Sequence, residues 1–117
     1  MNNADRELLE LAALAARYWE VDGWSIETHK GMRWVDEERF FVRYWNPLLD
    51  DGDAFRLAVQ LNISMDLCRW VQTAFYDVGA FVAEDWSNGG DAFAATRRAI
   101  VRAAAEIGRK MRGEGII

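Results

Sequence analysis

Three residue types are nearly missing from this 117-residue sequence, which has one cysteine, one proline and one histidine. The single cysteine, Cys68, excludes an intramolecular disulfide and fits a reducing cytoplasm. The single histidine, His29, has no catalytic partner at a recognisable spacing, and we expect it to be solvated at a hairpin tip. The one proline, Pro47, separates two kinds of hydrophobic pattern that predict different elements on its two sides.

Lysine is also rare, with two lysines against 12 arginines. The formal net charge of −5 and the pI of about 4.8 disfavour a protein that coats DNA or an anionic membrane, because phosphate binding needs a positive field. No apolar run approaches the ~18 residues of a membrane span, and residues 1–7 lack the basic and apolar regions of a signal peptide. We therefore expect a cytoplasmic protein with no membrane or bulk DNA partner.

Apolar and aromatic residues are plentiful, at 51% and 13% of the chain, beside 28% charged residues. This composition and length predict one globular domain over residues 1–117, with a core that needs no disulfide or metal. Six tryptophans are many for so small a core. We therefore expect some of them at a subunit interface or a ligand surface, and we expect a homo-oligomer.

Hydrophobic periodicity predicts a first helix over residues 4–19, ended by a left-handed Gly23. Alternating segments over 24–28, 32–35 and 39–45 then predict two or three strands.

After Pro47 the period becomes helical, which predicts a helix over about 52–61 with Phe55, Ala58 and Leu61 on its buried face.

The period returns to two from Ile63 onwards and predicts a strand, a hairpin near 76–79 and a second strand over 80–86. A last helix over about 92–112, capped by Asp91, follows. Its predicted buried stripe contains Phe93, Ile100, Ala103, Ala104, Ile107 and Met111.

The element order is therefore α-ββ(β)-α-ββ-α. Short connections between neighbouring strands favour antiparallel pairing. We predict an α+β fold in which an antiparallel sheet of about four to five strands is covered by helices.

Three carboxylates, Asp50, Asp51 and Asp53, follow Pro47 within a few residues. Clustered carboxylates suit a hard cation, but this spacing does not match a calcium loop. Capping of the following helix explains them more simply. We therefore expect Pro47 and the three aspartates to form a structural clamp, and we expect no metal, no cofactor and no catalytic residue.

Arg97 lies on the predicted apolar stripe of the last helix, and a buried arginine needs a partner. We predict that Arg97 or Arg98 pairs with a carboxylate of the Asp50–Asp53 loop. The alternative is a ligand site in which Thr96, Arg97 and Arg98 bind a phosphate and Trp45 offers a stacking surface.

Two blocks carry a family resemblance: WNPLLDDGDA at residues 45–54 with RLAV at 56–59, and DAFAATRRAIVRAAAEIG at 91–108. Their order and spacing resemble the small phage and prophage proteins of the phage ABA sandwich domain family. The resemblance implies a sheet between helical layers and no established reaction. It also implies a location in the host cytoplasm, because a phage would encode the protein.

Three functions are compatible with these residues. The first is a non-enzymatic phage accessory protein that binds a host protein or sequesters a small host nucleotide signal, by analogy with other small phage proteins. The second is a structural or assembly protein without a small ligand. The third, which we favour least, is a metal-dependent hydrolase that uses the acidic loop.

Overall fold

A computed structural model describes residues 2–17, 24–27, 31–36, 41–77 and 79–113, with only the backbone described for the strand residues up to 43. The elements follow the order α1 (Asn3–Ala15), β1 (Trp24–Glu27), β2 (Gly31–Asp36), β3 (Phe41–Trp45), α2 (Asp51–Leu61), β4 (Ser64–Cys68), β5 (Val71–Asp77), β6 (Ala80–Asp85) and α3 (Ala92–Met111). The predicted α+β class with antiparallel strands is therefore confirmed.

The strands form two three-stranded antiparallel sheets, in the orders β1-β2-β3 and β4-β5-β6, instead of one sheet of four or five strands. The segment between α1 and α2, for which the sequence predicted two or three strands, has three strands. The second region gains a strand because Arg69 and Trp70 form a turn between β4 and β5. Trp70 has a φ of 76°, a left-handed geometry usually supplied by glycine or asparagine, so the sequence carried no turn signal there.

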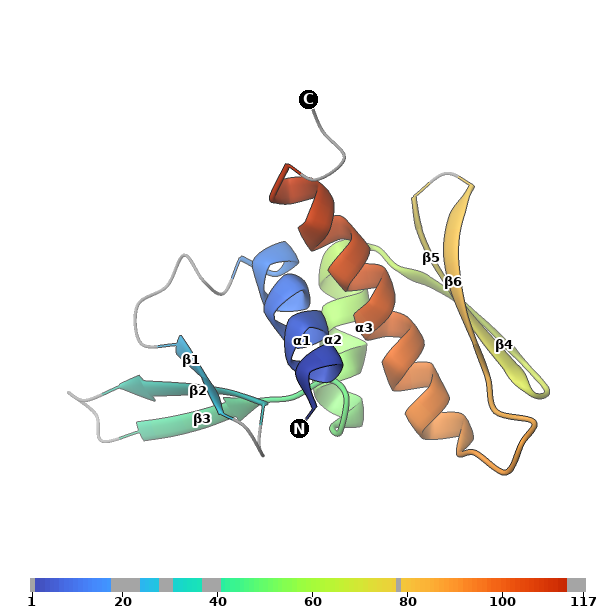
Figure 1. Cartoon of the computed structure of the whole chain (residues 1–117), viewed down its shortest axis with the longest axis horizontal. Coiled ribbons are helices and arrows are strands. Elements are labelled where there is room, and N and C mark those ends of the chain that lie inside the picture. The colour runs from blue at the N-terminus through green and yellow to red at the C-terminus, as the bar shows by residue number, and fades with distance from the viewer. Residues whose placement is uncertain (1, 18–23, 28–30, 37–40, 78, 114–117) are drawn as a thin grey trace.

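The helices lie between the two sheets (Figure 1). α3 packs on α1 and α2 on one side and on β5 and β6 on the other, while the β1–β3 sheet lies beyond α1 (Figure 1). This layer order differs from the sheet between helical layers that the family resemblance implies. The outer face of β4–β6 instead carries Phe75 and Phe81, whose exposed rings lie 5.8 Å apart.

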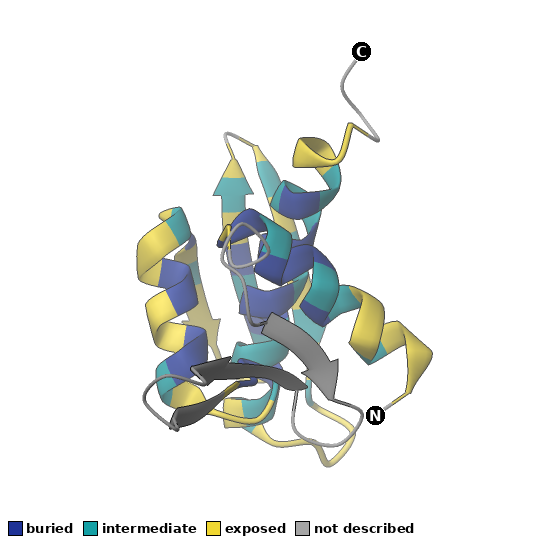
Figure 2. Cartoon of the chain, turned by 90° about the vertical axis from the view of Figure 1, so that its left-hand side faces the viewer, coloured by how far each residue is buried: buried dark blue, intermediate teal, exposed yellow. Residues whose placement is uncertain are grey.

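The core is built from small side chains where the helices face one another (Figure 2). Its fully buried members include Leu9, Ala12, Leu57, Val101 and Ala104. α1 and α3 approach so closely that a Cβ on Gly108 would lie 2.0 Å from the carbonyl oxygen of Leu11. Small residues therefore fix the distance between these two helices.

Each described helix begins at a capping side chain, and the caps of α2 and α3 are among the residues that the sequence indicated. Asn2, Asp50 and Asp91 are the N-caps of α1, α2 and α3, and each side chain accepts a backbone N–H of the first turn. α2 ends at Asn62, which has a left-handed φ of 56°.

The first helix ends at Ala15, four residues before the predicted end. Arg17 takes a φ of 63°, and its N–H donates to the carbonyl of Leu14 in a turn. Tyr18, Trp19 and the predicted terminator Gly23 lie outside the described residues, as does His29.

Three predicted core residues are exposed. Phe55 of α2 and Phe93 and Met111 of α3 lie on the surface, whereas Ala95, Ala99 and Ala105 are buried. The helix periods were correct, but the buried face is rotated toward alanines, which permit the close packing of α1 against α3. No helix in the described ranges is long and apolar enough to span a membrane.

Candidate functional site

The loop before α2 is held by its own carboxylates. Asp50 caps the helix by accepting the N–H of Asp53 at 2.8 Å. Asp53 is buried, and its two oxygens accept the N–H of Asn46 at 2.9 Å and the guanidinium of Arg56 at 2.8 Å. Pro47 is fully buried beside them. These contacts confirm the capping role of Asp50 and fix the direction in which the chain enters α2.

Arg97 joins this loop to α3, as predicted. Its Nη1 donates to Asp51 at 2.7 Å and its Nε donates to the carbonyl of Leu48 at 2.9 Å. The Arg97 side chain is only 15% exposed, whereas that of Asp51 is 65% exposed. The arginine is therefore a mostly buried cation that neutralises a carboxylate at the protein surface.

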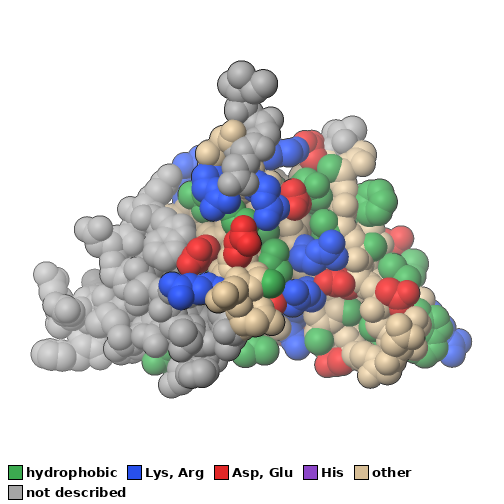
Figure 3. Space-filling model, in the orientation of Figure 1, with side chains coloured by type: hydrophobic (Ala, Val, Ile, Leu, Met, Phe, Trp, Pro, Cys, Tyr) green, Lys and Arg blue, Asp and Glu red, His purple; other side chains and the backbone are tan. Residues whose placement is uncertain are grey.

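Arg98 has other partners. It donates to Asp5 of α1 at 2.9 Å and lies 3.2 Å from Glu84 of β6, which also lies 3.4 Å from Arg102. Acidic and basic side chains consequently alternate on this face of the molecule (Figure 3). Arg98 ties α1, α3 and β6 together and does not line the same cavity as Arg97.

Of the four residues predicted to bind a ligand, only Thr96 and Arg97 lie in the same cavity. Trp45 is 1% exposed and belongs to the core, so it offers no stacking surface for a ligand. Thr96 donates its hydroxyl to the carbonyl of Ala92 at 2.8 Å, which is a bond within its own helix. Thr96 and Arg97 do line one cavity together, while Arg98 faces another. A phosphate-binding role for these arginines stays a prediction.

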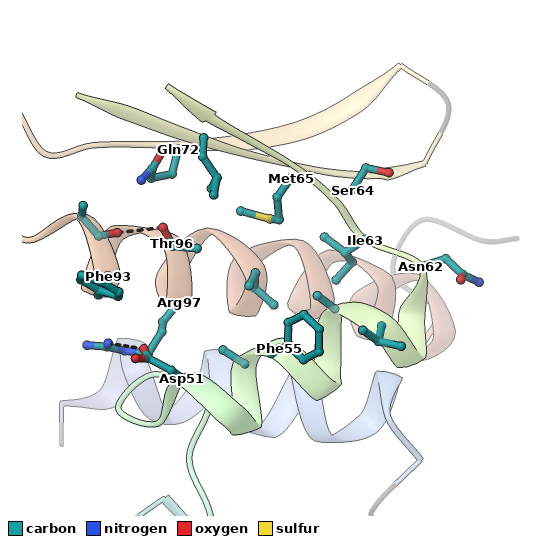
Figure 4. Close-up of a pocket in the computed structure, with 16 residues that line it drawn as sticks. Asp51, Phe55, Asn62, Ile63, Ser64, Met65, Gln72, Phe93, Thr96 and Arg97 are labelled. Carbon is teal, nitrogen blue, oxygen red and sulfur yellow. Dashed lines mark hydrogen bonds and ion pairs between the residues drawn. The ribbon is translucent and has the colours of Figure 1, made fainter. Parts of the chain in front are cut away.

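That cavity is a wide groove, which we call the α2–β4 groove (Figure 4). In Figure 4, β4 and β5 lie above it, α3 lies behind it and α2 lies below it. The tight connection from α2 to β4 through Asn62 and Ile63 closes one end. Phe93, Asp51 and Arg97 stand at the other end. Its volume is about 870 Å³, within the range of ligand-binding clefts.

The lining of the α2–β4 groove is mainly apolar, and its rim carries large exposed side chains. Phe55 and Val59 of α2, Leu67 of β4 and Phe93 of α3 are each 61–68% exposed. Isolated exposed apolar residues are ordinary on a protein surface, but four around one concave surface are not. The sequence offers only a weak signal for this surface, because the four-residue spacing of Phe55 and Val59 fits a buried helix face equally well.

One polar side chain in the groove lacks a partner. Gln72 of β5 lines the groove and is 6% exposed, and its Oε1 has no hydrogen-bond partner among the described residues. A buried amide without a partner is costly, and such groups often mark a site that a ligand completes. Among the described residues of the lining, the charged pair of Asp51 and Arg97 neutralises itself.

A second aromatic feature lies at the turn between β4 and β5. The rings of Trp70 and Trp86 are 4.7 Å apart, and the guanidinium of Arg69 lies 5.1 Å from the ring of Trp70. Close by, Cys68 is exposed and its thiol donates to Asp66 at 3.3 Å. This hydrogen bond and the negative charge of Asp66 raise the pKa of Cys68, which makes it a poor nucleophile.

Within the described part of the chain, no three His, Cys, Asp or Glu side chains are placed to hold a metal ion. Comparison with protein-family models, with curated proteins and with solved structures finds no match. The function is therefore argued from the geometry of the α2–β4 groove.

Proposed function

We propose that this protein is a non-enzymatic binding protein and that the α2–β4 groove receives its ligand. One observation carries the proposal: a cavity of about 870 Å³ is lined mainly by apolar side chains and ringed by four exposed large ones. Leaving these side chains in water has a cost that binding an apolar surface would recover, at roughly 25 cal/mol per Å². The uncompensated amide of Gln72 adds a polar group that orients the ligand.

This proposal keeps the non-enzymatic binding role of the first function inferred from the sequence, with an apolar ligand in place of a nucleotide. Sequestration of a host nucleotide requires cationic donors that are free for phosphate. Arg97 and Arg98 are both engaged with carboxylates, and the groove beside Arg97 is apolar. The nucleotide form, the phage origin and the homo-oligomer therefore stay predictions that the groove neither needs nor supports.

The test uses an uncharged apolar dye, Nile red, whose fluorescence rises and shifts to the blue in an apolar site. Titration should show saturable binding to the wild-type protein. Phe55→Lys should weaken it at least about tenfold, because a buried Phe contact contributes about 1.5–3 kcal/mol. Phe81→Lys is the matched control, since Phe81 is also exposed but lies on the outer face of the sheet. Equal losses in both variants, or no saturable binding, would refute the proposal.

A further inference from the structure

The α2–β4 groove lies in the same layer of the fold as α3. α3 covers the inner faces of β5 and β6. It leaves the inner face of β4 largely uncovered, because the side chain of Met65 is only half-buried and that of Leu67 is exposed. α2 lies below this layer, on the side of α3 away from the sheet (Figure 4). The groove is therefore the space beside α3 in which a second helix would cover β4.

The dimensions of the groove match a short helix. Its lining runs along α2 from Asp51 to Asn62 and along α3 from Ala92 to Ile100. At a rise of 1.5 Å per residue these spans are about 16 Å and about 12 Å, or two to three helical turns. Like α3, the groove lies between the sheet and α2 (Figure 4).

The chemistry of the groove indicates what such a helix must carry. Phe55 and Val59 below, Leu67 above and Phe93 at the open end require an apolar stripe, and Gln72 requires one polar group within that stripe.

The charged side chains that line the groove's open end, Asp51 and Arg97, balance each other. The exposed cap Asp50 precedes Asp51 in the sequence and has Arg56 as a neighbour. The chain as a whole carries −5. Charge complementarity therefore favours a partner with lysine or arginine beside its apolar stripe.

We infer that the α2–β4 groove binds an amphipathic helix of a partner protein, with an apolar stripe of two to three turns flanked by basic residues. This inference rests on the proposed function and names its ligand class. The apolar residues of such a helix would recur at i, i+3, i+4 and i+7, which is the pattern of helix-in-groove recognition.

An added strand fits the groove less well. β4 is an edge of its sheet, so a strand could pair with it. That strand would lie beside the sheet, however, whereas the groove extends beneath it to Gln72 on the central strand β5. A ligand that reaches Gln72 must pack on the face of the sheet, as a helix does.

A second copy of the chain also fits less well. The large apolar residues exposed on the described helices are Phe55, Val59, Phe93 and Met111. The first three already belong to the groove. A second copy consequently offers no described helix with a free apolar stripe, and it brings a like net charge of −5.

The test compares three labelled peptides of about 14 residues with the same leucine content. The first has leucines at helical spacing with lysine flanks, the second has alternating leucines with lysine flanks, and the third has helical spacing with glutamate flanks. Fluorescence anisotropy against the full chain should show the first binding at least about tenfold tighter than the other two. Its advantage over the glutamate peptide should shrink as salt rises.

The Phe55→Lys and Phe81→Lys pair decides where the peptide binds. Binding of the first peptide should weaken about tenfold in Phe55→Lys and stay within about twofold of wild type in Phe81→Lys. Circular dichroism of wild-type protein with unlabelled peptide should show a gain of helix signal on mixing.

The remaining outcomes separate this inference from the proposed function. If the alternating peptide binds as well as the helical one, the groove or the β4 edge accepts a strand and the inference is wrong. If Nile red binds at the groove but no peptide does, the ligand is a small apolar molecule; the proposed function then stands without the helix. If the chain is a dimer that Phe55→Lys makes monomeric, a second copy covers the groove. If neither dye nor peptide binds, both proposals fail.

Discussion

Replacing Gly108 by alanine tests the close approach of α1 to α3. The new Cβ would lie 2.0 Å from the carbonyl oxygen of Leu11 and 2.8 Å from its carbonyl carbon. Both atoms belong to a helix backbone, so neither can rotate away, and the helices must separate by about an ångström. That separation would loosen the fully buried alanines between them, such as Ala12 and Ala104.

The magnitude follows from two opposing terms. Overpacking a close-packed site costs about 1–3 kcal/mol, and a backbone contact without freedom to move lies at the upper end of that range. Alanine recovers about 1 kcal/mol of helix propensity over glycine. The net loss should be about 2 kcal/mol, or about 8 °C in Tm for a domain of this length.

Urea unfolding followed by circular dichroism measures this loss as a lower midpoint with an unchanged m-value. Gly52→Ala is the control, because the glycine lies in the first turn of α2 and its added Cβ would meet only side-chain atoms, the guanidinium of Arg56 and Oδ1 of Asp50, each at 3.2 Å. The control should be neutral or more stable by up to about 1 kcal/mol. A Gly108→Ala protein as stable as Gly52→Ala would refute the close packing of the two helices.

Three further predictions follow from contacts of single side chains. Arg97→Ala should lower the free energy of unfolding by about 1.5–3 kcal/mol in urea, because it removes charge-assisted bonds from a mostly buried guanidinium, whereas exposed Asp51→Ala should cost less. Trp70→Gly should change the free energy of unfolding by less than about 1 kcal/mol, because glycine accepts the left-handed φ and this gain offsets the lost contact with the ring of Trp86. The same change should remove the near-ultraviolet circular dichroism that the Trp70–Trp86 pair contributes. Cys68 should react slowly with iodoacetamide at pH 8, because Asp66 raises the pKa of its thiol. Asp66→Asn should speed the reaction by lowering that pKa, and an unchanged rate would show that Asp66 does not control it.

Local chemistry made much of the fold predictable. The caps at Asp50 and Asp91, the break at Pro47 and the helical and alternating periods each depend on near neighbours in the sequence. The pairing of Arg97 with the acidic loop was also predictable, because a cation on an apolar stripe requires a carboxylate and one cluster was available.

The candidate site was not predictable because it depends on what the tertiary structure leaves uncovered. Phe55 and Phe93 occupy positions that fit a helical core stripe, yet alanines fill the core and the two rings face the groove. The turn at Trp70, which splits one predicted strand into two, has no sequence signal because tryptophan rarely takes a positive φ. Trp45 was assigned to a ligand surface, and only the packing of the helices shows that it is buried.

The contact between α1 and α3 also determines when the protein is able to fold. The ion pair of Asp5 with Arg98 joins residues 93 positions apart, and Gly108 meets Leu11 across a similar separation. During synthesis, α1 therefore leaves the ribosome long before its packing partner exists, with the apolar side of Leu9, Leu11 and Ala12 uncovered. Contacts of such high sequence separation slow folding, because a long loop must close before they form. Folding of this chain is accordingly expected to wait for α3, with most of the sequence already translated.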